Sequence, residues 1–173
     1  VTFPLNSAAD LNARELEQDT IARLFVELGV TVAEFAAWLG GDPNGLEAAT
    51  ARITRVIETL TPVGFGTVPE PGPPVGHSYA CVFHLGVLLR LCMPSLGERS
   101  LLKAVQTPPN GNTEEYQQYL RMRATGSSNT PGRPVLWPSA FEYVEHCIRG
   151  NFRHAVVSMP TGSGKSFIGE LAV

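Results

Sequence analysis

Proline and glycine dominate the segment from Thr61 to Gly76, "TPVGFGTVPEPGPPVG", which holds five prolines and four glycines. Proline fixes the backbone angle φ and has no N–H to donate, while glycine loses the most backbone entropy on ordering. A segment of this composition cannot form the interior of a helix or strand, so we expect a linker over residues 61–76. The regular elements must then lie on either side of it, in residues 1–60 and 77–173.

The first sixty residues contain three stretches with apolar residues at helical spacing. The first covers residues 8–28 and stops at Gly29. The second opens at Thr31-Val-Ala-Glu34, which has the pattern of a capping box, and stops at Gly40. The third covers residues 42–60. Together they predict a small bundle of three short helices.

The charges of this bundle favour contact with protein over contact with DNA. A helix-turn-helix protein needs a basic recognition helix, and the third stretch offers only Arg52 and Arg55. We therefore expect the N-terminal helices to pack against, or dock with, a protein partner.

A second helical unit is predicted over residues 77–125. Residues 77–93 are largely apolar and indicate a helix or a pair of strands, and residues 96–105 have the spacing of a short amphipathic helix. Asn112-Thr-Glu-Glu115 has the pattern of another helix start. The polar stretch 126–134, "GSSNTPGRP", predicts a flexible linker. The expected fold class is therefore mostly α up to this point.

The last predicted helix of this unit combines aromatic and basic residues. Tyr116, Tyr119 and Leu120 fall at helical spacing, with Arg121 and Arg123 beside them. Such a combination is found where a nucleic acid strand binds, and also where a surface helix buries one edge. We favour the second interpretation.

Hydropathy and cysteine usage predict a soluble, cytoplasmic protein without membrane contact. The most apolar stretch, Tyr79 to Met93, is interrupted by His84 and Arg90 and falls short of the roughly 18 residues that a transmembrane helix needs. The three cysteines form no CxxC pair. Cys81 and Cys92 have the wrong spacing for a zinc site, so we expect buried thiols.

Charge is unevenly distributed along the chain. Residues 1–60 hold nine acidic residues against four arginines, whereas residues 90–165 hold nine basic residues against five acidic ones. The nine acids are Asp10, Glu15, Glu17, Asp19, Glu27, Glu34, Asp42, Glu47 and Glu58. The basic half suits a phosphate-bearing partner, although a solvated surface is the commoner cause of such a bias.

A phosphate-binding loop is predicted at Met159 to Ser166, "MPTGSGKS". The apolar stretch 154–159 before it has the pattern of a buried strand, and residues 166–173 after it have helical spacing. Strand, glycine-rich loop and helix are the context in which a Walker A loop binds phosphate. The chemistry thus points to binding of ATP and Mg²⁺.

The residues of the loop have separable roles. Gly162 and Gly164 allow successive N–H groups to turn towards an anion, and the start of the following helix adds its dipole. Lys165, the catalytic candidate, is placed to reach the β- and γ-phosphates, and the Ser166 hydroxyl is placed to bind Mg²⁺. The candidate nucleotide-binding residues in the loop are Thr161, Gly162, Ser163, Gly164, Lys165 and Ser166.

The loop and the residues before it resemble the opening of a superfamily 2 helicase, and MPTGSGKS is most similar to the loop of RecQ-like DNA helicases. The resemblance covers residues 136–173. Met159 stands where the strict Walker A pattern has glycine, a change that these helicases tolerate. Upstream, Pro138, a helix over residues 139–149 and a turn at Gly150 match the family's adenine-binding motif.

The adenine-reading glutamine of that motif is missing, because Ala140 stands in its place. Trp137 offers a ring that could stack on a nucleobase, although a tryptophan beside a proline is more often a packing anchor. The resemblance implies that residues 135–173 begin the α/β motor domain of an ATP-dependent helicase or translocase that acts on nucleic acid, with DNA favoured over RNA. It also suggests a multi-component DNA-processing or bacterial defence system.

Such a motor hydrolyses ATP with parts that follow the loop, namely an acidic motif and an arginine finger. These parts do not occur in the 173 residues, so we expect the chain to be the N-terminal portion of a longer protein. Two alternatives stay open. One is a P-loop ATPase that is indifferent to DNA, and the other is a protein-interaction module that carries a severed, inactive loop.

Overall fold

The computed structural model describes residues 8–60, 77–107, 111–150, 154, 156–158 and 164–172. The chain is mostly α-helical, as predicted, with one two-stranded sheet. It divides into two compact units. The first unit comprises Val1–Phe35 and Asn44–Cys92, and the second comprises Ala36–Pro43 and Met93–Val173. The predicted linker 61–76 and the loop residues 159–163 lie outside the described residues.

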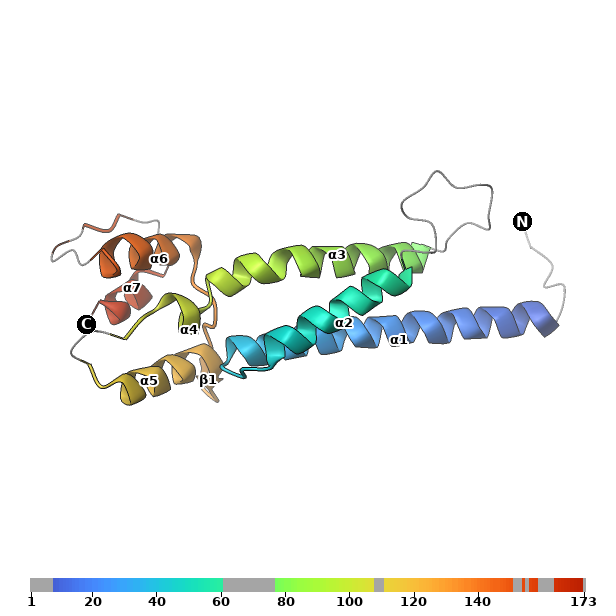
Figure 1. Ribbon diagram of the computed structural model, residues 1–173, viewed down its shortest axis with the longest axis horizontal. Coiled ribbons are helices and arrows are strands. Elements are labelled where there is room, and N and C mark those ends of the chain that lie inside the picture. The colour runs from blue at the N-terminus through green and yellow to red at the C-terminus, as the bar shows by residue number, and fades with distance from the viewer. Residues whose placement is uncertain are drawn as a thin grey trace. The chain divides into compact units, whose positions relative to one another are not determined.

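Three helices form the first unit: α1 (Ala8–Leu39), α2 (Gly45–Leu60) and α3 (His77–Glu98), of which α1 and α3 continue into the second unit. Figure 1 shows α2 alongside α1 and α3. The three helices meet at Gly86, where an added Cβ would lie within 4 Å of Ile57, Ile53 and Leu28. The predicted apolar stripe of α2 is confirmed, because Ile53 and Leu60 are buried.

The predicted helix break at Gly29 is wrong, because α1 runs without interruption from Ala8 to Leu39. Thr31 is fully buried, and its Oγ1 donates to the carbonyl of Glu27 at 2.8 Å, as a threonine inside a helix does. Glu34 bonds to Arg52 of α2. The residues that resembled a capping box therefore have partners elsewhere, and nothing ends the helix there.

One arginine joins α2 to α1 through two carboxylates. Arg52 donates to Glu34 from Nε at 3.0 Å and from Nη2 at 2.8 Å, and to Glu27 from Nη1 at 2.5 Å. The hydrogen bonds from Arg52, followed by its charge and that of Arg55, lower the pKa of Glu34 below its ordinary value of 4.5. The pair is thus favoured in its charged form.

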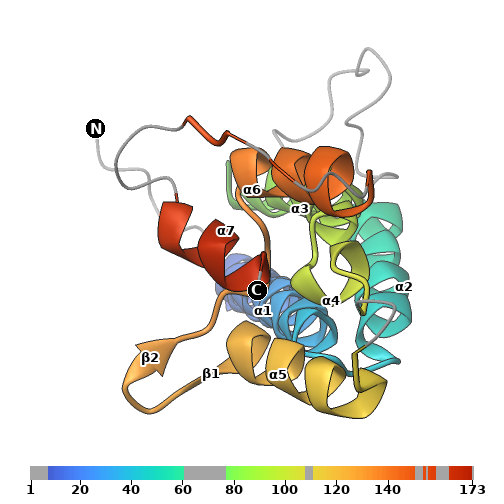
Figure 2. The same ribbon diagram turned by 90° about the vertical axis from the view of Figure 1, so that its left-hand side faces the viewer.

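The second unit combines four α-helices, a π-helical turn and a small hairpin among its described residues (Figure 2). Its elements are α4 (Leu101–Ala104), α5 (Thr113–Thr125), β1 (Gly126–Ser127), β2 (Thr130–Pro131), α6 (Pro138–Tyr143), η2 (Val144–Ile148) and α7 (Lys165–Leu171). The predicted cap of α5 is confirmed, because Asn112 Oδ1 accepts from the N–H groups of Glu114 and Glu115. A helix is also confirmed after Pro138, where α6 passes directly into η2.

The core of this unit contains side chains from α4, α5, α6, η2 and α7. Leu120 of α5, Val144 of η2 and Leu101 of α4 are fully buried, and Phe167 and Ile168 of α7 are each 4% exposed. At about 25 cal/mol per Å² of apolar surface removed from water, such a cluster is the main term that holds α7 in place. The segment after the glycine-rich loop is therefore part of the unit's core.

The strand predicted before the loop is not formed by the residues described there. His154 and residues 156–158 adopt no regular structure, and the side chain of Val156 is fully exposed. A parallel strand needs neighbouring strands to bond its N–H and C=O groups. The only sheet in the described part of the chain is the β1–β2 hairpin, which offers no such partner.

The apolar helix α3 is longer than the apolar stretch that the sequence analysis expected. The helix continues through His84 and Arg90, and Ser78–Glu98 is long and apolar enough to cross a membrane, the one such helix among the described residues. Its mean hydropathy in the best window is 1.6. Core helices of soluble proteins meet the same criterion, so this finding by itself assigns no membrane.

Replacing Gly29 tests the continuity of α1. Glycine inside a helix is less stable than alanine by about 0.5–1 kcal/mol, and a Cβ at position 29 would meet no atom within 4 Å. Gly29→Ala should therefore raise the free energy of unfolding by about that amount in a urea titration. Gly86→Ala is the matched control and should gain less, because its Cβ would lie 3.3 Å from Ile57. A loss of stability in Gly29→Ala would restore the helix break.

The Arg52 cluster predicts an acid-sensitive contribution to stability. Because the folded-state pKa of Glu34 is lowered, its contribution is present above pH 4.5 and is lost as the pH falls through the lower folded value. Arg52→Gln should lower stability at neutral pH and flatten its fall at acidic pH, as measured by denaturant titrations across that range. Arg23→Gln removes a more exposed ion pair with Asp19 and should leave the pH profile unchanged.

Candidate functional site

The second unit contains a cavity of about 610 Å³, a volume typical of small-molecule sites. Its wall comes from the end of α3, the segment between β2 and α6, the first turn of α6 and the start of α7. The lining residues are Leu96, Arg99, Gly132, Arg133, Pro134, Val135, Leu136, Trp137, Pro138, Ala140, Gly164 and Phe167.

Backbone pairing fixes the segment that forms one side of the cavity. The N–H of Leu101 donates to the carbonyl of Pro134 at 2.8 Å, and the N–H of Leu136 donates to the carbonyl of Arg99 at 2.8 Å. These two bonds flank an antiparallel bridge between Ser100 and Val135. The residues before α6 are therefore held extended against the end of α3.

The hairpin that leads into this segment depends on two glycines. Gly126 has φ of 78°, and a Cβ there would lie 2.3 Å from the nitrogen of Gly132. A Cβ at Gly132 would lie 2.2 Å from the carbonyl oxygen of Ala124. Only glycine allows this close approach of two backbone segments. Residues 126–134, which we expected to form a flexible linker, thus contain a tight hairpin joined to α5.

Trp137 is the aromatic residue that the sequence analysis singled out, and it lines the cavity at the N-terminal end of α6. Its side chain is 67% exposed. The packing-anchor interpretation is therefore wrong, because an anchor would be buried. The exposed ring is available to stack on a flat ligand.

The described residues of the predicted phosphate loop lie beside the same cavity. Gly164 has φ of 89°, the left-handed conformation that glycine adopts readily, and it lines the cavity together with Phe167. Lys165 and Ser166 lie between these two residues, open α7 and are exposed. The remaining candidates Thr161, Gly162 and Ser163 fall outside the described residues.

Two arginines flank the aromatic ring of Phe167. The guanidinium carbon of Arg133 lies 5.6 Å from the ring centroid, and that of Arg123 lies 5.7 Å from it, both in the range of cation–π attraction. Arg123 also pairs with Glu170 of α7 at 2.5 Å. These contacts hold α7 against α5 and place the Arg133 guanidinium at the edge of the cavity.

Sequence analysis missed Arg99, Arg133 and Phe167 as members of the site. Arg133 belongs to a stretch interpreted as linker, and Arg99 follows the end of α3. Their proximity depends on the Ser100–Val135 bridge, for which the local sequence carries no signal. Phe167 was recognised only as an apolar position of the last helix.

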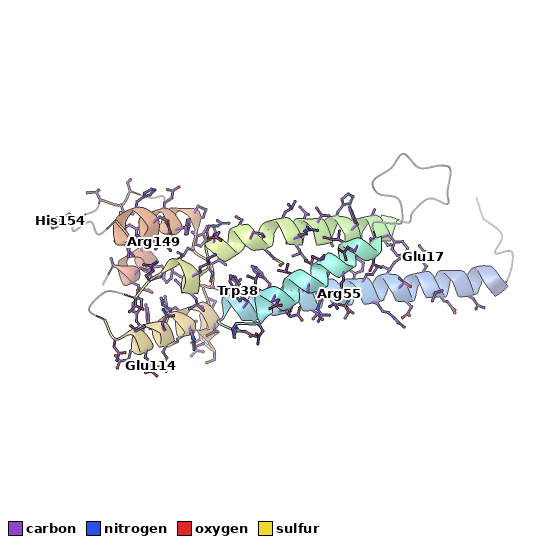
Figure 3. The ribbon with its side chains drawn as sticks, in the orientation of Figure 1. Glu17, Trp38, Arg55, Glu114, Arg149 and His154 are labelled. Atoms are coloured by element: carbon purple, nitrogen blue, oxygen red, sulfur yellow. The ribbon has the colours of Figure 1, made fainter. Side chains whose placement is uncertain are left out.

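Several other polar and aromatic residues of the second unit have structural partners. Arg149, labelled in Figure 3, donates to the carbonyl of Ala104 at 3.1 Å and pairs with Glu145, which joins η2 to α4. Tyr116 and Tyr119 of α5 are half-buried, with ring centroids 6.3 Å apart, and burial raises the pKa of Tyr116. The edge of α5 therefore packs inward, as we favoured.

The cysteines differ from expectation, because Cys81 and Cys92 are exposed on α3 rather than buried. Within the described ranges, no three His, Cys, Asp or Glu side chains approach closely enough to hold a metal ion.

Comparison with known proteins leaves the geometry to carry the functional argument. No family model, curated protein or solved structure matches the chain. The function is therefore inferred from Gly164 of the glycine-rich motif and from the exposed Trp137, which line the same cavity.

Proposed function

We propose that the second unit binds a nucleoside triphosphate, with ATP as the expected ligand. The observation that supports this most directly is that Gly164 and Trp137, which the sequence selected for phosphate and base respectively, line one cavity. They are 27 positions apart in the chain. In this proposal the base stacks on the Trp137 ring and the phosphates reach the loop that ends at Ser166.

Lys165 and Ser166 would hold the phosphate end. Both side chains are exposed at the start of α7, beside Gly164. The Lys165 ammonium would pair with the β- and γ-phosphates, and the Ser166 hydroxyl suits a Mg²⁺ ion that arrives with the nucleotide. Mg²⁺ would neutralise phosphate charge there. Phe167 and Ile168 pack α7 into the core of the unit. The backbone that carries Lys165 and Ser166 is therefore held in place.

Nucleotide binding is the activity that this chain is proposed to carry by itself. Hydrolysis needs a carboxylate that orients water and a cation that stabilises the transferred phosphoryl group. The described residues that line the cavity include two arginines and no carboxylate. We propose that turnover and movement along DNA belong to an assembled superfamily 2 motor similar to RecQ-like helicases, in a cytoplasmic setting.

Docking of a protein partner is a second candidate function, and exposed apolar side chains of the first unit favour it. Phe25 and Val26 of α1 are 42% and 63% exposed, and Leu88 and Leu91 of α3 are 56% and 68% exposed. Protein interfaces commonly include apolar side chains that are exposed in the free protein. This agrees with the expected role of the N-terminal helices.

The loop assignment predicts a strong effect of Lys165→Ala. Loss of a hydrogen bond to a charged group costs about 1.5–3 kcal/mol, so the variant should bind Mg-ATP roughly 10- to 100-fold more weakly. Fluorescence anisotropy with a labelled ATP analogue measures this directly. Lys103→Ala is the matched control, because Lys103 is the other lysine and pairs with Glu98 at 2.7 Å. Equal affinity in Lys165→Ala and the unaltered chain would contradict the assignment.

A further inference from the structure

The polar side chains of the cavity are hydrogen-bond donors. Among the described lining residues, Arg99 and Arg133 offer guanidinium N–H groups and Trp137 offers its indole N–H. The other described lining residues are glycine, proline or apolar, so none carries a side-chain acceptor. The side chains of the cavity can therefore donate hydrogen bonds to a ligand but cannot accept them.

Both arginines keep donors for a ligand. Arg99 uses Nε in a long contact of 3.4 Å to the carbonyl of Ser95, and Arg133 lies over the face of Phe167. Neither forms an ion pair with any other described residue. A guanidinium stacked on a ring still presents its N–H groups in the plane of the fork.

Two backbone carbonyls of the paired segment already accept hydrogen bonds within the protein. The carbonyl of Arg99 accepts from Leu136, and that of Pro134 accepts from Leu101. Ala140, 1% exposed at the cavity, contributes a methyl group and no polar atom. The side chains that line the cavity thus offer a ligand hydrogen-bond donors and no acceptor.

This chemistry discriminates among nucleobases. Adenine presents the N6 amino group as a donor beside its N7 acceptor, whereas guanine presents two acceptors, O6 and N7, on the same edge. A guanidinium donates to both guanine acceptors at once and faces an unmatched donor on adenine. Stacking on Trp137 is indifferent to the base, because every base has a π face.

We propose that the cavity does not select adenine and that it binds GTP at least as tightly as ATP. The proposal rests on the proposed function, since it presupposes that a nucleoside triphosphate occupies the cavity. The base stacks on Trp137, and its acceptor edge receives N–H groups from Arg99 or Arg133. The specificity-determining residues are these two arginines.

The experiment measures the affinities of Mg-ATP, Mg-GTP, Mg-CTP and Mg-UTP for the whole chain by competition against a labelled nucleotide. We expect GTP to bind with equal or up to about tenfold higher affinity than ATP, as one bidentate contact allows. Arg99→Gln combined with Arg133→Gln should supply amide acceptors and shift the GTP-to-ATP ratio towards ATP. Arg55→Gln is the control, because Arg55 is an exposed residue of α2 in the first unit, and it should leave the ratio unchanged (Figure 3).

A third variant separates stacking from edge recognition. Trp137→Leu should weaken all four nucleotides by a similar factor, about tenfold, and keep the ratio between them. ATP bound more tightly than GTP, by more than the error of the measurement, would overturn this inference and leave nucleotide binding intact. Binding of none of the four nucleotides would instead overturn the proposed function itself.

Discussion

The second unit depends on two backbone hydrogen bonds, which join Leu101 to Pro134 and Leu136 to Arg99. They fix the extended segment before α6 against the end of α3, and the Ser100–Val135 bridge lies between them. One consequence is that Trp137 lines the same cavity as Gly164 and Phe167 at the start of α7. Backbone N–H and C=O groups away from water need hydrogen-bond partners, so this pairing holds in place the segment that lines the cavity.

The local parts of the fold were predictable because their signals are local. The stripe of α2 and the Asn112 cap of α5 depend on residues within a few positions of one another, and both are confirmed. The errors came from residues with distant partners. Glu34 completed an apparent capping box, yet it bonds to Arg52, eighteen positions away. The buried Thr31 was similarly mistaken for a cap.

Some residues of the candidate site were likewise predictable from the sequence, and others were not. Gly164, Lys165, Ser166 and Trp137 were found from sequence, because a glycine-rich motif and an unusual Trp-Pro pair are visible without a fold. Arg99 and Arg133 were not, because only the pairing of segments more than thirty positions apart brings them to one cavity. The sequence thus indicates the residues proposed to bind phosphate, and the fold adds the residues proposed to face the base.

Nucleotide binding beside Trp137 can be followed directly through the fluorescence of its indole ring. The chain has two tryptophans, so a Trp38→Phe variant leaves Trp137 as the sole indole fluorophore. Its emission should be measured during titration with Mg-ATP. We expect a saturable change, because a base stacked on an exposed indole alters the surroundings of the ring. An unchanged emission up to millimolar nucleotide would contradict it.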